Sequence, residues 1–261
     1  YDTLVGIIRR QQSATDITRM WQNLGELRQR MLHFMENHDE QRLASDFIAG
    51  HGRPALPAVL VSATIDTCPM MVYFGQELGE RGMDAEGFSG RDGRTTIFDY
   101  WSVDTIRRWR DGGTFSGREL NDGERDLQRQ YARLLHLARE ERAISEGDFF
   151  DLMYANPYSD RFNSHRMYAF LRKHDDELLL IVANFDEHAT EVDVHIPIHA
   201  FDYFHLPTLE GVEAVELLTG TTTTLSLTPD APVRLTVPGY SGGVWKVRQP
   251  LAAVNRTEGA G

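Results

Sequence analysis

The stretch Met31-Leu-His-Phe-Met-Glu-Asn-His-Asp-Glu-Gln-Arg42 decides the first half of the fold. Its apolar beginning, residues 31–35, has the length of a strand buried on both faces, as in a parallel sheet. Its polar end, residues 36–42, has the composition of a loop that joins a strand to the next helix. Such loops converge at the carboxyl ends of parallel strands, where reacting groups gather. The stretch therefore predicts a strand that carries ionisable side chains to a functional face.

Helical patterns flank this strand, and a second strand repeats its design. Apolar residues recur at helical spacing over residues 17–31, and a proline opens an apolar helix over residues 54–65. Residues 70–74 form a second buried apolar run that ends in a polar loop. A capping-box spacing begins a third helix over residues 121–140. We therefore expect residues 1–145 to be α/β.

From about residue 146 the apolar period changes from helical to two. The segments are short, rich in Val, Ile, Leu and Thr, and separated by turn signals, which is typical of an antiparallel β-sandwich. The expected strands lie near 166–171, 177–184, 190–196, 213–218, 222–227, 232–237 and 243–248. The fold class is thus α/β plus all-β, with an α/β domain to residue 145, a sandwich over 146–248 and a frayed tail over 249–261.

Composition excludes several classes of function. The chain has 261 residues and a net charge of −12, and its Lys and Arg are scattered, so we expect no nucleic-acid partner and no anionic lipid surface. No run approaches the roughly 18 apolar residues of a membrane span. The single cysteine, Cys68, permits no intrachain disulfide and leaves the compartment unknown.

Two ordered motifs resemble those of a known family. His33-Phe34-Met35-Glu36-Asn37-His38-Asp39 resembles the Phe-x-x-Asn-His-Asp signature that ends the seventh barrel strand of the α-amylase family, glycoside hydrolase family 13. The segment from Cys68 to Gly79 resembles the eighth strand, with its Pro-x-x-x-Tyr-x-Gly-x-Glu pattern. A β-sandwich follows the barrel in that family. The resemblance covers essentially the whole chain and implies the C-terminal part of a TIM (β/α)8 barrel followed by an antiparallel β-sandwich.

The resemblance also implies roles for particular residues. Asp39 matches the third catalytic carboxylate, which stabilises an oxocarbenium-like transition state and binds sugar hydroxyls as charge develops. His38 matches the histidine that contacts the sugar at the cleavage site. Asn37, Arg42 and Tyr73 are carried over as further substrate-binding candidates.

Other residues near these motifs keep two interpretations. Glu36 is as well placed for a structural ion pair with Arg42 as for a contact with the sugar. Tyr73 and Glu77 are expected to support the eighth strand structurally. A long loop over the same face could contact distal sugars through Arg91, Asp92 and Arg94, with a solvated loop as the alternative. Trp101 and Trp109 could stack on sugar rings, with helical or core packing as the alternative. His33, His38 and His51 do not have metal-ligand spacing, so we expect no metal site in this chain.

A retaining mechanism also needs a nucleophile and a general acid, which in this family come from strands four and five. The chain has no Gly-x-Arg-x-Asp nucleophile motif. We therefore expect the remaining barrel to come from upstream sequence or from a second chain, and we expect the isolated chain to be inactive. The implied protein is an α-amylase-type hydrolase acting on α-1,4-glucans such as starch and maltooligosaccharides. It needs no cofactor in this chain, and calcium stays open for the full-length enzyme.

Two alternatives to an enzyme remain. The chain could be a non-catalytic glucan-binding or accessory module, or an inactive family member that binds another protein. Within the enzyme reading, the sequence does not choose among endo-amylase, α-glucosidase, cyclomaltodextrinase and glucanotransferase, because that choice depends on loops from the other barrel strands.

Overall fold

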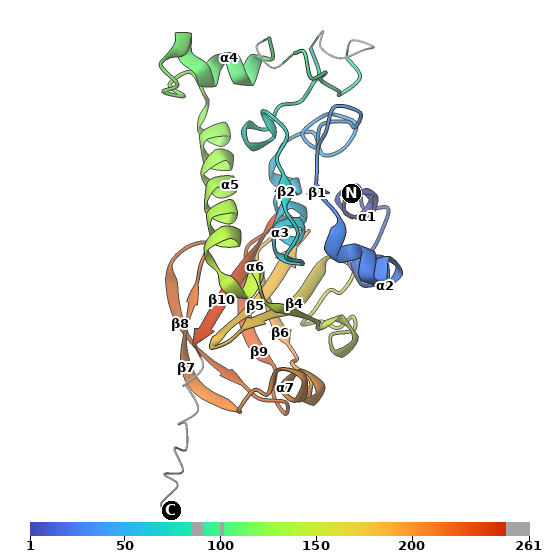
Figure 1. Ribbon diagram of the computed structural model, residues 1–261, viewed down its shortest axis with the longest axis vertical. Coiled ribbons are helices and arrows are strands. Elements are labelled where there is room, and N and C mark those ends of the chain that lie inside the picture. Colours follow the sequence, from blue (N-terminus) through green and yellow to red (C-terminus); the bar gives the residue numbers. More distant parts are fainter. Residues whose placement is uncertain (85–90, 100–101, 249–261) are drawn as a thin grey trace, which may run out of the picture.

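The computed structural model describes residues 1–84, 91–99 and 102–248, so Trp101 and the expected tail 249–261 lie outside the described residues. Helices and one short pair of strands occupy one end of the molecule, and a β-rich domain occupies the other (Figure 1). The long helix α5, Asp122–Glu140, runs along the first part and leads to the second.

The first part alternates helices with two parallel strands. After the helices α1 (Asp2–Ile8) and α2 (Asp16–Leu24), the chain passes through a 3-10 turn (Gly25–Arg30) into β1 (His33–Phe34). It continues through a 3-10 turn (Arg53–Ala55) into α3 (Leu56–Thr64), then β2 (Met70–Met71), a 3-10 turn (Gln76–Leu78), α4 (Asp104–Arg110), a 3-10 turn (Asp111–Gly113), α5 and α6 (Arg142–Ser145). β1 pairs with β2 in parallel, which places the loops that follow them at the same edge.

The strands of this part are shorter than the apolar runs that predicted them. Residues 31–35 and 70–74 yield only two paired positions each, His33 with Met70 and Phe34 with Met71. Strand assignment requires ladder hydrogen bonds, and within the described residues each strand has only the other as its partner. Likewise the predicted helix over 17–31 ends at Leu24, because Gly25 adopts a positive φ of 50° and a 3-10 turn replaces the last turns.

The helix α5 begins where the sequence predicts. Asn121 Oδ1 accepts a hydrogen bond from the backbone N–H of Glu124 at 2.9 Å, and the Glu124 carboxylate accepts from the N–H of Asn121 at 2.8 Å. The two bonds satisfy N–H groups that the helix itself cannot pair. The apolar face of α5 is buried, and α5 contacts α3, whose residues are all buried.

The C-terminal domain is antiparallel, and strands form at all seven places that the period-two pattern predicts. Six strands form the sheet in the order β3-β4-β5-β10-β7-β8, and β6 pairs with β9 in a second, two-stranded sheet. β9 contacts β5, β8 and β10, so the small sheet lies against the large one. The strands are β3 (Asp148–Asp151), β4 (Met167–His174), β5 (Glu177–Asn184), β6 (Thr190–Val194), β7 (Leu209–Glu216), β8 (Thr221–Leu227), β9 (Val233–Val237) and β10 (Ser241–Arg248). The sequence pattern missed β3, a 3-10 turn (Met153–Ala155) and the helix α7 (Ile198–Phe204).

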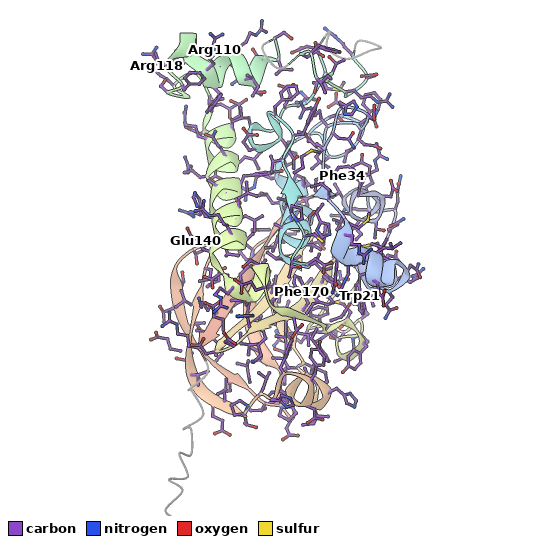
Figure 2. The ribbon with its side chains drawn as sticks, viewed as in Figure 1. Trp21, Phe34, Arg110, Arg118, Glu140 and Phe170 are labelled. Carbon is purple, nitrogen blue, oxygen red and sulfur yellow. The ribbon has the colours of Figure 1, made fainter. Side chains whose placement is uncertain are left out.

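Aromatic rings join the two parts of the molecule. The ring of Trp21 on α2 meets Phe149 on β3 edge-on at 5.4 Å, and Phe149 lies 5.6 Å from Phe170 on β4. Figure 2 places Trp21 and Phe170 at the level where the helices meet the sheet. The α/β part is thus packed onto the sandwich through a continuous hydrophobic core.

Candidate functional site

The loop that follows β1 is folded by its own polar side chains. Asn37 Oδ1 accepts hydrogen bonds from the backbone N–H groups of Asp39 at 2.8 Å and of Glu40 at 2.9 Å. Asn and Asp side chains commonly stabilise turns in this way. Asn37 therefore fixes the backbone on which His38 and Asp39 stand, and its amide oxygen is already used.

His38 and Asp39 present their side chains to solvent. The Asp39 side chain is 74% exposed and that of His38 is 50% exposed, with Nε2 of His38 3.4 Å from Oδ2 of Asp39. A carboxylate that follows the carboxyl end of a parallel strand stands on the face where barrel enzymes carry their chemistry. The pair can offer an ionised oxygen to a developing cation and an N–H donor to a hydroxyl group.

The base of the same loop is a buried ion pair. Arg42 Nη1 donates to Glu36 Oε2 at 2.7 Å, and the backbone N–H of Leu43 donates to Glu36 Oε1 at 2.8 Å. Both side chains are almost completely buried. Burial raises the pKa of Glu36, although Arg42 and Leu43 act in the opposite direction. The structural pair that the sequence left open for Glu36 is therefore present, and Arg42 has no exposed surface in this chain.

The loop that follows β2 meets the first loop at Arg42. The guanidinium carbon of Arg42 lies 4.4 Å from the ring centroid of Tyr73 and 4.9 Å from that of Phe74. Tyr73 donates its hydroxyl to the Thr95 carbonyl at 3.2 Å, and burial raises its pKa. Tyr73 thus supports the end of β2 and the connection after it, which is the structural role weighed for it from the sequence.

The remaining sequence candidates have identifiable surroundings. Asp92 accepts a hydrogen bond on its carbonyl from Gln41 Nε2 at 2.9 Å, so its loop does lie beside the loop of β1. Glu77 is half-buried, and burial raises its pKa. Trp109 packs edge-on against Phe115 at 5.3 Å, and His33 bonds the Ser62 carbonyl of α3 through Nδ1 at 2.7 Å. Thr95, which binds Arg42, was not a candidate, because no local pattern marks it.

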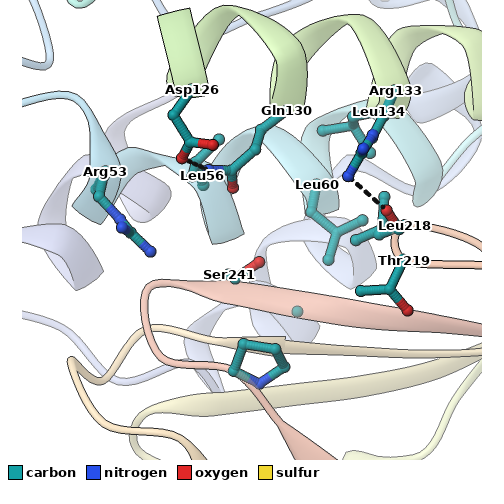
Figure 3. A pocket seen from close by; sticks show the side chains of 12 residues that line it. Arg53, Leu56, Leu60, Asp126, Gln130, Arg133, Leu134, Leu218, Thr219 and Ser241 are labelled. Atoms are coloured by element: carbon teal, nitrogen blue, oxygen red, sulfur yellow. Dashed lines mark hydrogen bonds between the residues drawn. The ribbon is translucent and has the colours of Figure 1, made fainter. Parts of the chain in front are cut away.

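A separate cavity lies between the helices and the sandwich. It has a volume of about 260 Å³, and its walls come from α3, α5, the turn after β7 and the start of β10 (Figure 3). Leu56, Leu60 and Leu134 supply apolar surface, and Arg133 donates to the Leu218 carbonyl at 3.2 Å. Neither His38 nor Asp39 contributes to this cavity.

Two further findings concern the described residues alone. They contain no cluster of three or more His, Cys, Asp or Glu side chains suited to a metal ion. In residues 1–84, 91–99 and 102–248, no helix has both the length and the apolar character needed to cross a bilayer.

Comparisons with known proteins agree with this architecture. Residues 162–245 match the family model of the C-terminal domain of maltogenic amylase. Among solved structures, a noncanonic maltogenic α-amylase from Thermotoga neapolitana is similar over 94% of this chain and 48% of its own, with 16% identity and a TM-score of 0.59. An α-amylase from Geobacillus thermoleovorans, complexed with acarbose, matches over 94% of this chain and 47% of its own, with 17% identity and a TM-score of 0.57. A cyclomaltodextrinase matches over 94% of this chain and 35% of its own, with 17% identity and a TM-score of 0.60. A comparison of the sequence with curated proteins found no match.

In fold, the chain is therefore similar to solved amylases and to a cyclomaltodextrinase. More particularly, residues 162–245 match a maltogenic-amylase C-terminal domain, and this match agrees with the resemblance of the chain to the α-amylase family. The chain spans about half the length, or less, of the amylases it matches.

Proposed function

We propose that this chain is part of a retaining α-amylase-type glycoside hydrolase that acts on α-1,4-glucans such as starch and maltooligosaccharides. Asp39 stabilises the oxocarbenium-like transition state, and His38 binds a hydroxyl of the sugar at the cleavage site. Asn37 holds the loop, and Tyr73 lies beneath the sugar-facing surface. The nucleophile and the general acid come from barrel strands outside this sequence.

One observation carries the proposal. The Asn37-His38-Asp39 segment follows directly from β1, the β2 loop emerges at the same edge, and Arg42 contacts Tyr73 between them. This is the arrangement expected at the carboxyl face of a barrel, and Asp39 is its most exposed carboxylate within the motif. Exposure suits a group that must reach a substrate.

The remainder of the barrel is the partner that this proposal requires. Leu27, Met31 and Leu32, which lead into β1, are 63%, 43% and 51% exposed. Apolar side chains beside a short parallel pair suit burial by further strands and helices. The proposal assigns that cover to upstream sequence or to a second chain.

The test is an Asp39→Asn variant of the enzyme that contains this chain, assayed on soluble starch and maltooligosaccharides. The rate should fall by several orders of magnitude, because the amide cannot stabilise the developing positive charge. Asp46→Asn is the matched control, since Asp46 is an exposed carboxylate in the same connection that pairs with Arg81. Near-normal turnover by the Asp39→Asn enzyme would remove the basis of the proposal.

A second candidate is a glucan-binding role for the sandwich, which exposed aromatic rings favour. Tyr154 and Tyr203 are 60% and 54% exposed, and each ring packs against Phe150, at 6.4 Å and 5.6 Å. Exposed aromatic rings with a polar edge suit the alternating apolar and hydroxylated surfaces of a pyranose.

Affinity electrophoresis of the full chain in an amylose gel separates the two functions. If the sandwich binds glucan, a Tyr154→Ala/Tyr203→Ala variant should migrate faster than wild type in amylose and at the same rate without it. Tyr158→Ala serves as control, because Tyr158 is about as exposed but its ring packs against His165 and not against Phe150. An unretarded wild-type chain removes the support for a binding module and leaves the enzyme proposal untouched.

A further inference from the structure

We infer that the buried Glu36–Arg42 ion pair is a positioning device that sets where the Asp39 carboxylate stands, and that Arg42 acts through this pair rather than by touching the sugar. The inference rests on the proposed role of Asp39 and extends it to residues that are out of reach of any substrate in this chain.

The ion pair closes the loop that carries Asp39. Glu36 precedes Asn37, and its two carboxylate oxygens bind the other end of the loop, one through Arg42 Nη1 at 2.7 Å and one through the Leu43 N–H at 2.8 Å. Both ends of a seven-residue loop are thereby held by one carboxylate. Asn37 then fixes the interior, so that the backbone of Asp39 is held on both sides.

Arg42 couples this closed loop to the connection that follows β2. Its Nε and Nη2 atoms approach Thr95 Oγ1 at 3.0 Å and 2.5 Å, and its backbone N–H donates to the Gly93 carbonyl at 2.6 Å. Tyr73 covers the guanidinium plane and bonds the carbonyl of the same Thr95. A planar guanidinium can make these contacts at once, whereas an ammonium group cannot. The loop of β1 is therefore held in register with the end of β2.

Burial makes this arrangement rigid. Arg42 is 0% exposed and Glu36 is 1% exposed, so neither charge has water as an alternative partner. Loss of one partner leaves an uncompensated buried charge, and the loop must move to hydrate it. A displacement of about 1 Å in a group aligned with a reacting centre can cost about a hundredfold in rate.

The experiment compares three variants in the enzyme that contains this chain. Arg42→Lys keeps the charge but loses the forked contact with Thr95, and should lower kcat about tenfold or more while KM stays within about twofold. Arg42→Met leaves Glu36 unpaired and should lose both stability and kcat. The double variant Glu36→Leu/Arg42→Met removes both charges, so it should regain thermal stability but not kcat.

A second, partly buried ion pair gives the control. Arg28 Nε lies 3.3 Å from Asp66 Oδ1, and these residues precede β1 and β2, at the opposite end of the strands from Asp39. Arg28→Met should lower the melting temperature without lowering kcat. This control separates loss of stability from loss of position, because it breaks an ion pair in the same part of the molecule but away from the loop that carries Asp39.

The outcomes distinguish this inference from the proposed function. If Asp39→Asn abolishes turnover while Arg42→Lys and the double variant keep wild-type kcat, the positioning role is wrong and the role of Asp39 stands. If the double variant does not fold, Arg42→Lys decides the matter by its KM and kcat alone. If Asp39→Asn retains normal turnover, the proposed function fails first, and the positioning role fails with it.

Discussion

Arg172 offers the sharpest test of how the two parts of the molecule are joined. Its side chain is buried on β4, and among the residues that the structure describes its guanidinium donates to no carboxylate. It donates to four backbone carbonyls, those of Ala143 at 3.0 Å, Ile65 at 3.0 Å, Ile144 at 2.6 Å and Gly147 at 2.8 Å. Ile65 lies at the end of α3, and the other three lie in or just after α6. One cation therefore satisfies carbonyls at helix ends that have no partner within the helix.

The loss of stability expected for Arg172→Met follows from the number of these hydrogen bonds. Each of the four lost bonds contributes about 1 kcal/mol net, and the orphaned carbonyls stay buried, so the free energy of unfolding should fall by about 4 kcal/mol. At about 2–4 °C per kcal/mol for a chain of this size, the melting temperature should fall by about 8–16 °C. Burial lowers the pKa of Arg172 to about 10, so at pH 7 the side chain is charged in both states and no proton is exchanged.

Urea unfolding followed by circular dichroism measures this difference. With a urea dependence of about 3 kcal/mol per molar, the midpoint should shift by about 1–2 M. Arg234→Met is the control, because the Arg234 side chain is 64% exposed in its ion pair with Asp193, so its loss should shift the midpoint far less than the loss of Arg172. If Arg172→Met unfolds at the same urea concentration as wild type, the four carbonyls have other donors and the reasoning fails.

Three further perturbations test other contacts. Asp151→Ala removes an acceptor shared by Thr18, Trp21 and Tyr168, and should destabilise the chain by about 2–4 kcal/mol, with a red shift in tryptophan fluorescence that an unshifted spectrum would contradict. Glu77→Gln should raise the thermal midpoint at pH 7 but not near pH 4. Burial raises the pKa of Glu77 above its ordinary 4.5, so the stability of the wild-type chain falls as the pH rises from 4.5 through the folded pKa. The glutamine amide does not titrate, so the variant keeps its stability over that range. Equal midpoints at pH 7 would refute that sign. Loss of the α5 cap in an N121A variant should cost about 1 kcal/mol in thermal unfolding, and an unchanged midpoint would show that tertiary packing alone starts the helix.

The sequence predicted those parts of the fold that depend on local pattern. Strands over 166–248 follow the short apolar segments between turn signals, although β4 and β5 are buried almost throughout and only strands such as β9 alternate. The helix α5 follows its capping residues, so both appear close to where they were expected. The helix α7 was missed because Ile198–Phe204 combines three aromatic residues and a histidine in a short segment that lacks a side-chain cap. The strands at 31–35 and 70–74 are short because pairing depends on neighbours that lie elsewhere, which no local pattern encodes.

In the candidate site, too, the sequence predicted what a local motif encodes and missed the contacts between residues far apart in the chain. The motif placed His38 and Asp39 on one loop, and the parallel pairing of β1 with β2 brings Tyr73 to the same edge. The sequence did not predict that Arg42 is buried or that Thr95 holds it, because those contacts join residues 53 positions apart. The roles of Asp39, His38, Asn37, Arg42 and Tyr73 toward a sugar stay predictions.

The two buried arginines differ in what can replace them, and this difference follows from their partners. Arg42 binds a carboxylate, so substitution of Glu36 removes the opposing charge and leaves an apolar pair of similar volume. Within the described part of the chain, Arg172 donates to backbone carbonyls alone, which no substitution removes. A second mutation can therefore restore the stability lost at position 42, whereas no side-chain change that lacks a donor can restore it at position 172. The loop that carries Asp39 is thus held by a contact between two side chains, whose contribution to stability a second mutation can restore. The join between the two parts of the molecule is held by Arg172, which no side chain without a donor can replace. Variation in the candidate site therefore need not destabilise the fold that supports it.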